Sequence, residues 1–106
     1  MCNYIIVTTL CDKEKIKDKI VDTLLQKRLV AGAQVSKVYS KYIWNNKLEE
    51  CEEYKIEFRT KENLFEKIEK TIKQIHDYEV CEISYRKIDG GSNEILNWID
   101  ENTKSN

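Results

Sequence analysis

The stretch from residue 42 to residue 53 constrains the fold more than any other, because its pattern is typical of a long β-hairpin. An aromatic segment ends at Trp44, the pair Asn45 and Asn46 follows, and a segment rich in glutamate comes next. Asn tolerates a positive φ angle, so an Asn pair between extended segments favours a tight two-residue turn. Tyr and Trp side chains on such a hairpin either pack against another chain or line a pocket. Both alternatives predict that the protein does not act as a solitary monomer.

Hydrophobic periodicity predicts the elements that precede the hairpin. Residues 3–10 form a short apolar run with β-branched side chains, which indicates a buried strand. Asp12 is placed to cap a helix whose apolar residues recur at helical spacing as far as Arg28. Residues 33–44 are extended. The two-residue alternation slips between Lys37 and Ser40, which predicts a bend or bulge there.

Four further elements and a tail are predicted after the turn. Residues 54–59 alternate between apolar and charged side chains, as in a strand with one buried face, and residues 61–74 return to helical spacing. Residues 81–85 alternate again in a fourth strand. Ser92 follows a glycine turn and can cap a last helix, and residues 102–106 are expected to fray.

This order of elements predicts one α+β domain that spans residues 1–106. A chain of 106 residues supports a single core and is too short for two. Strand, helix, strand, strand, helix, strand is the ferredoxin-like βαββαβ arrangement, an antiparallel sheet with two helices on one face. The second and third strands form the long hairpin, and a short C-terminal helix completes the fold.

The charge balance and the hydropathy of the chain exclude several classes of function. Eighteen basic and nineteen acidic residues give a net charge of -1, which leaves no basic excess to hold a nucleic acid. No apolar run approaches the roughly 20 residues of a membrane span, and the apolar stretch 5–7 is too short for a signal-peptide core. We therefore expect a cytoplasmic protein with neither nucleic acid nor membrane as a partner.

The use of cysteine and histidine argues against redox, zinc-knuckle and catalytic sites. The four cysteines, Cys2, Cys11, Cys51 and Cys81, are scattered and form no C-x-x-C pair, which disfavours disulfide stapling and a structural zinc site. With a single histidine, no Ser-His-Asp or Cys-His nucleophile can be argued, and Gly90-Gly91 is only a turn. We predict that the protein is not an enzyme.

Three segments of the chain resemble the CutA divalent-cation tolerance proteins and follow one another in that family's order and spacing. They are Tyr42-x-Trp44-x-x-Lys47-Leu48-Glu49-x-x-x-Glu53, His76-x-Tyr78-Glu79-Val80-x-Glu82-Ile83 and Leu96-Asn97-Trp98-Ile99. The resemblance implies a cytoplasmic homotrimer of ferredoxin-like subunits, related in architecture to the PII signalling proteins. In such a trimer the long hairpins pair with neighbouring subunits and form inter-subunit clefts. The resemblance also implies binding of copper or other divalent metal ions.

The chain departs from the family pattern at positions where proline or cysteine is usual. Asp77 and Cys81 stand at two positions where the family has proline, so the fixed φ angle of proline is absent. Gly32 stands where many members carry a cysteine, and Thr8-Thr9 stands where some bacterial members carry one. A copper site built on those cysteines does not transfer to this chain. Cys11 and Cys81 are thiols close to motif positions, which leaves soft-metal binding open in altered form.

The candidate metal ligands are His76, Glu82 and Cys81. Imidazole with carboxylates suits Cu(II), Zn(II) or Ni(II), and a cysteine with a histidine also suits Cu(I). The alternative is that His76 satisfies the last carbonyl groups of its helix, and the sequence leaves both interpretations open. One histidine per chain makes a weak site, but three chains that meet at clefts can assemble ligands that a single chain lacks. We expect that no metal is essential for folding.

The candidate cleft residues are Trp44, Lys47, Glu53 and Tyr78. Glu49 and Glu53 share one face of their strand, and Glu53 is the carboxylate opposite the aromatic side of the hairpin. The aromatic residues suit packing between subunits equally well, and Lys47 suits a purely solubilising role. Two functions therefore stand: a divalent-cation tolerance protein with metal sites between subunits, and a PII-like trimeric regulatory scaffold that binds a small anionic ligand or a partner protein. A purely structural trimer is a third alternative.

Overall fold

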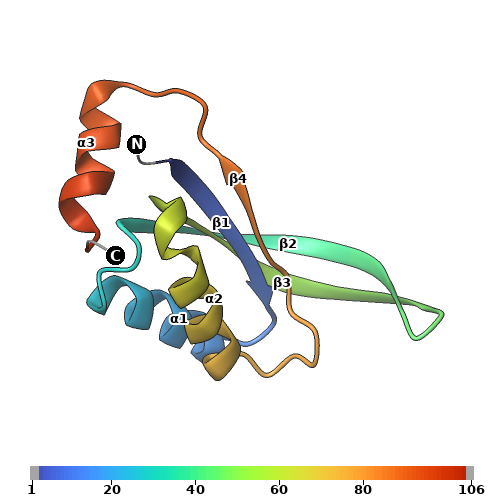
Figure 1. Ribbon diagram of the computed structural model, residues 1–106. Helices are drawn as coiled ribbons and strands as arrows, with labels where there is room; N and C mark the ends of the chain where they lie inside the picture. Colours follow the sequence, from blue (N-terminus) through green and yellow to red (C-terminus); the bar gives the residue numbers. More distant parts are fainter. Residues whose placement is uncertain (1–2, 105–106) are drawn as a thin grey trace.

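The computed structural model describes residues 3–104, which form a four-stranded antiparallel sheet with two helices packed on one face (Figure 1). The strand order is β2-β3-β1-β4, and every neighbouring pair is antiparallel, so the predicted ferredoxin-like arrangement is confirmed. The elements are β1 (Tyr4–Cys11), α1 (Glu14–Gln26), β2 (Gly32–Trp44), β3 (Lys47–Lys61), a 3-10 turn (Glu62–Leu64), α2 (Phe65–Ile75), β4 (Ile83–Lys87) and α3 (Asn93–Asn102).

The hairpin of β2 and β3 projects well beyond the rest of the sheet (Figure 1). Its turn residues have the positive φ angles that a two-residue turn of type I′ requires, 52° at Asn45 and 63° at Asn46. The expected bulge between Lys37 and Ser40 is wrong, because pairing runs without interruption from Gly32 opposite Arg59 to the last pair before the turn. The alternation slips there because the projecting part of the hairpin has no covered face to enforce it.

The core lies between α1 and α2 and the face of the sheet that they cover. Alternate residues of β1 and β3 point into it, and apolar residues of both helices meet them. The central members, all fully buried, are Ile5, Val7, Ile20, Leu24, Ile56, Phe58, Ile68 and Ile72. Within residues 3–104, no helix layer covers the opposite face of the sheet. The α3 helix packs near the start of β2, where the Trp98 ring lies over Gly32.

Two helix starts show how a sequence signal succeeds or fails locally. The predicted cap of α3 is confirmed, because the Ser92 Oγ accepts a hydrogen bond from the Ile95 N–H at 3.2 Å. The predicted cap of α1 is wrong. Lys13 occupies that position and makes no side-chain cap, and the Asp12 carboxylate lies 3.7 Å from the Lys13 Nζ instead. At the other end of α1, Arg28 lies two residues after the helix and has a φ angle of 58°, which is the left-handed backbone conformation that often follows the end of a helix.

The fourth strand and the C-terminal segment also differ from prediction. The strand begins at Ile83, two residues later than predicted. Fraying from Asn102 is wrong, because that residue still belongs to α3, the Thr103 hydroxyl donates to the Ile99 carbonyl at 2.9 Å, and the Lys104 N–H donates to the Arg28 carbonyl. Residues 1–2, with Cys2, and 105–106 lie outside the described part of the chain. None of the described helices is long and apolar enough to cross a membrane.

Candidate functional site

A hollow of about 850 Å³ lies between the projecting hairpin and the loop that joins α2 to β4, and we name it the hairpin groove. Aromatic residues from both sides line it, with Tyr39, Tyr42 and Trp44 on the hairpin and Tyr78 on the loop. Six carboxylates also line it: Asp12, Glu49, Glu50, Glu53, Glu79 and Glu82. The groove therefore gathers four of the predicted site residues, namely Trp44, Glu53, Tyr78 and Glu82.

Glu53 and Tyr78 connect the two walls of the groove. The Tyr78 hydroxyl donates a hydrogen bond to the Glu53 Oε2 at 3.0 Å, and Glu53 is only 7% exposed. Burial, followed by the bond to Glu53, raises the pKa of the Tyr78 phenol far above its ordinary value. The phenol therefore stays protonated and remains a hydrogen-bond donor at physiological pH.

His76 does not line the groove, and both of its ring nitrogens are engaged. Its Nε2 is 2.6 Å from the Leu10 carbonyl oxygen, and its Nδ1 accepts a hydrogen bond from the Tyr78 N–H at 3.1 Å. Since the Nδ1 accepts, the Nε2 carries the proton and donates. The imidazole is 1% exposed and packs against the Tyr78 ring at an interplanar angle of 52°, with centroids 4.5 Å apart. Metal ligation by His76 stays a prediction, and it requires one of these two bonds to open.

Glu82, Cys81 and Lys47 are the remaining predicted site residues, and of these only Glu82 lines the groove. The Glu82 Oε2 accepts a hydrogen bond from the Ser84 hydroxyl at 2.9 Å. The Cys81 thiol is half-buried without lining the groove, and burial raises its pKa. Lys47 is exposed at the turn, opposite Trp44, and also does not line the groove. Within residues 3–104, no three His, Cys, Asp or Glu side chains lie close enough together to hold a metal ion.

Sequence reasoning missed Cys51 as a groove residue. Its Sγ lies 3.8 Å from the Tyr42 hydroxyl, diagonally across the hairpin, and burial raises the pKa of the thiol. The signal was available, because residues two apart in a strand share a face, and Cys51 therefore lies on the same face as Glu49 and Glu53. Asp12 and Glu79 could not be found in that way, because loops bring them to the groove.

The charges of the groove favour a cation. Lys41 is the one cationic side chain among its lining residues, and its Nζ already lies 3.3 Å from the Glu50 carboxylate. Five of the six carboxylates are thus left without a cationic partner inside the groove. A small anion would meet a repulsive field there, whereas a metal ion or another cation would be attracted.

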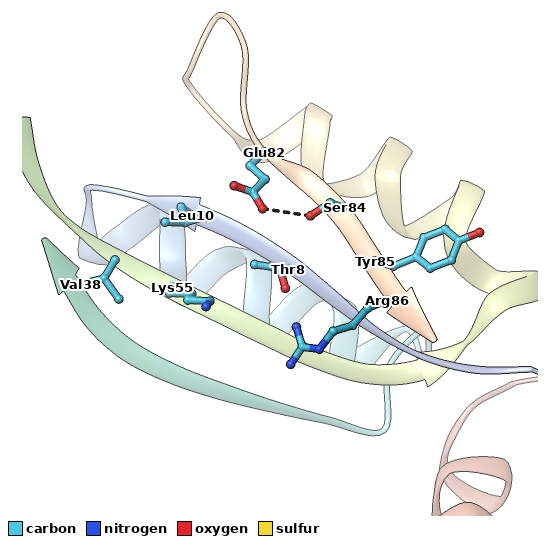
Figure 2. Close-up of a pocket in the computed structure, with 8 residues that line it drawn as sticks. All are labelled: Thr8, Leu10, Val38, Lys55, Glu82, Ser84, Tyr85 and Arg86. Atoms are coloured by element: carbon cyan, nitrogen blue, oxygen red, sulfur yellow. Dashed lines mark hydrogen bonds between the residues drawn. The ribbon is translucent and has the colours of Figure 1, made fainter. Parts of the chain in front are cut away.

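A second hollow, of about 410 Å³, lies on the face of the sheet that α1 and α2 leave open, and we name it the sheet hollow (Figure 2). Its lining includes Thr8 from β1, Lys55 from β3 and Arg86 from β4. Arg86 Nη1 forms an ion pair at 3.0 Å with Glu57 Oε2. The sheet hollow shares Leu10 and Glu82 with the hairpin groove, but it also contains the basic side chains of Lys55 and Arg86, whereas carboxylates predominate in the groove.

The fold and the groove together define a class: small α+β proteins with a ferredoxin-like sheet, a projecting hairpin and an acidic, aromatic groove at its base. The family model described as CutA1 divalent ion tolerance protein matches residues 4–102, so the chain belongs to this family. The divalent-cation tolerance protein CutA of Pyrococcus horikoshii is 36% identical over 100 residues, which cover 94% of this chain and 97% of that protein.

Solved structures agree with this assignment. The crystal structure of CutA1 from Pyrococcus horikoshii superposes with a TM-score of 0.90 at 34% identity and covers 95% of this chain and 99% of that one. The divalent cation tolerance protein CutA1 from Thermus thermophilus superposes with a TM-score of 0.91 at 28% identity, with 95% and 99% covered. The predicted family resemblance and fold class are both confirmed.

Proposed function

We propose that the protein is a cytoplasmic homotrimer that binds copper or other divalent metal ions at clefts between its subunits and so contributes to metal tolerance. The observation that carries this proposal is the hairpin groove, which is lined by six carboxylates and by a single lysine that is already paired. Carboxylate oxygens bind divalent ions readily, and the adjacent Cys51 thiol extends the donor set to softer ions such as copper. The relatives are named for tolerance of divalent cations, which agrees with this ligand class.

Assembly into a trimer is supported by the apolar side chains that the hairpin exposes. Tyr39, Ile43 and Leu48 are between 61% and 68% exposed. Apolar side chains gathered on a projecting hairpin are typical of a surface that another chain covers. A neighbouring subunit at this place would also close the open side of the groove. It could complete a metal site that one subunit lacks, since no three ligands converge within residues 3–104.

The groove carboxylates Glu53 and Glu82 are the first candidates for metal ligands, and Trp44 lines the same cleft. His76 and Cys81 would join only after a local rearrangement, because the imidazole nitrogens are engaged and the thiol lies outside the groove. Metal is not needed for folding under this proposal, because the core beneath α1 and α2 contains none of these residues.

The proposed role is binding rather than catalysis, with metal ions and further copies of the chain as partners. Residues 3–104 contain three free thiols and the full chain has a net charge of -1, which agrees with a reducing compartment and with the absence of a nucleic-acid partner. The PII-like alternative, with an anionic ligand in the cleft, is less well supported. Lys47 does not line the groove, and the groove itself is acidic.

A titration of the reduced protein with Cu(I), Cu(II) and Zn(II) tests the proposal, with oligomer mass measured by sedimentation in the same samples. We expect saturable binding to a trimer and a loss of affinity of at least tenfold in Glu53→Gln and Glu82→Gln. The matched control is Glu66→Gln on the exposed side of α2, which should bind like wild type. His76→Ala tests whether the imidazole joins the site, provided that the Tyr78 amide keeps its protection from hydrogen exchange in that variant. A stable monomer at micromolar concentration, or equal affinity in all variants, would contradict the proposal.

A further inference from the structure

The loop that joins α2 to β4, residues 76–82, forms one wall of the hairpin groove. Tyr78, Glu79 and Glu82 line the groove from this loop. Residues 76–82 are neither helix nor strand, so regular backbone pairing does not set their conformation. Side-chain contacts with the rest of the subunit therefore decide where the loop residues lie.

One such contact is an ion pair between Lys13 and Asp77. The Lys13 Nζ donates a hydrogen bond to the Asp77 Oδ2 and lies 3.7 Å from the Asp12 Oδ1. Lys13 directly precedes α1, and Asp77 lies 64 positions further along the chain, in the loop after α2. The ion pair therefore fixes the loop to the segment between β1 and α1.

Asp77 lies between two residues that position the groove wall. Its Oδ1 is 3.6 Å from the His76 Nδ1, and this nitrogen accepts the hydrogen bond from the Tyr78 N–H. The Tyr78 hydroxyl in turn donates to the Glu53 carboxylate across the groove. Because consecutive residues are joined by rigid peptide units, a displacement of Asp77 would also displace Tyr78.

We propose that Lys13 is a positioning residue for the hairpin groove, because its ion pair with Asp77 holds Tyr78 and the loop carboxylates in the groove wall. Lys13 does not itself line the groove. The side chains of Lys13 and Asp77 are 60% and 36% exposed, so salt screens their ion pair. The loop should therefore loosen as the ionic strength rises. Only the effect on metal affinity rests on the proposed function, and the effect on the loop does not.

Hydrogen exchange of the Tyr78 amide in the metal-free, assembled protein tests this proposal. Lys13→Gln/Asp77→Asn removes the ion pair without changing the net charge, and the protection of this amide should fall about two- to fivefold. The amides of β1, which exchange through wider opening of the sheet, should change less. Lys73→Gln/Glu69→Gln is the matched control. It removes an ion pair of similar exposure, 63% and 38%, within α2 and should leave the Tyr78 amide unchanged.

A proline at position 77 gives a second test, because it restrains the loop without an ion pair. His76 has an extended backbone, with a φ angle of -69° and a ψ angle of 144°, which is the conformation that a following proline favours. In Lys13→Gln/Asp77→Pro, the Tyr78 amide should regain its protection. An increase from low to moderate NaCl should lower the protection in wild type and leave that of the proline variant unchanged.

A metal titration of the same variants separates this inference from the proposed function. If the groove binds metal, Lys13→Gln/Asp77→Asn should weaken binding about two- to fivefold, and the Lys73→Gln/Glu69→Gln control should bind like wild type. If wild type binds no metal, the proposed function fails, and the exchange data still decide the role of Lys13. Unchanged protection of the Tyr78 amide in Lys13→Gln/Asp77→Asn, or a loss no larger than that in β1 or in the control, would overturn the positioning role.

Discussion

The Tyr78 hydroxyl and the Glu53 carboxylate, 3.0 Å apart, join the loop after α2 to the base of the projecting hairpin. The bond matters because Glu53 is 7% exposed and sits in a groove that supplies no unpaired cation to it. Without a cationic partner, only hydrogen-bond donors can offset the free-energy cost of burying this carboxylate. The Tyr78 hydroxyl therefore helps to hold the two walls of the groove together.

Tyr78→Phe should destabilise the protein by about 1–3 kcal/mol, because it leaves a buried carboxylate oxygen without its donor. Urea unfolding at a fixed protein concentration measures the change. Tyr85→Phe is the control, since it removes a similar bond, to Glu62, from a tyrosine that is 40% exposed, and should cost less than about 0.5 kcal/mol. Equal losses of unfolding free energy in the two variants would show that the burial of Glu53 does not add to the cost of removing its donor.

His76→Ala should cost about 2–4 kcal/mol, because it removes a buried ring and the hydrogen bonds to the Leu10 carbonyl and the Tyr78 amide. Hydrogen exchange supplies a second readout, in which the Tyr78 amide should lose its protection. Gln74→Ala, at an exposed position of α2, should leave both readings near wild type. If the Tyr78 amide stays protected in His76→Ala, the imidazole does not hold the loop.

Gly32→Ala should destabilise the protein by about 1–3 kcal/mol, because a Cβ at this position would lie 2.8 Å from the Trp98 ring. Trp98 must then move, and its fluorescence should shift with it. Gly90→Ala is the matched control, since a Cβ there meets no atom within 4 Å. In the double variant with Trp98→Leu, the two losses should be less than additive. Full additivity would show that the Gly32 position is not limited by the ring.

Wild type should lose stability relative to Cys11→Ala as the pH rises from about 9 to 11. Burial raises the pKa of the Cys11 thiol from 9.0 to about 11, so the unfolded chain ionises first. The stabilisation by the neutral thiol is complete below pH 9 and is lost toward pH 11, by an amount on the order of 2 kcal/mol. Unfolding curves between pH 8 and 11 measure it. The less buried Cys51 should give a smaller change in Cys51→Ala, and a flat difference for Cys11→Ala would contradict the prediction.

Elements whose signals are local were predicted well. The Asn45-Asn46 turn and the Ser92 cap depend on backbone angles and on hydrogen bonds within four residues, so the sequence is enough to place them. The cap of α1 was wrong because Lys13 intervenes between Asp12 and the helix. The frayed tail was wrong because Lys104 bonds to the Arg28 carbonyl, a partner that periodicity cannot reveal.

By itself, the sequence determined the order of the elements, the hairpin turn and the face of each strand that enters the core, because periodicity and turn chemistry act over a few residues. It also determined the family, through three motif segments that can be recognised in the chain. Only the tertiary structure decided which partners the predicted site residues contact. His76 meets the Leu10 carbonyl across 66 positions of sequence, and Tyr78 meets Glu53 across 25. The role of a side chain is set by its partners in space, so the engaged imidazole and the acidic groove emerge only when the loop and the hairpin are brought together.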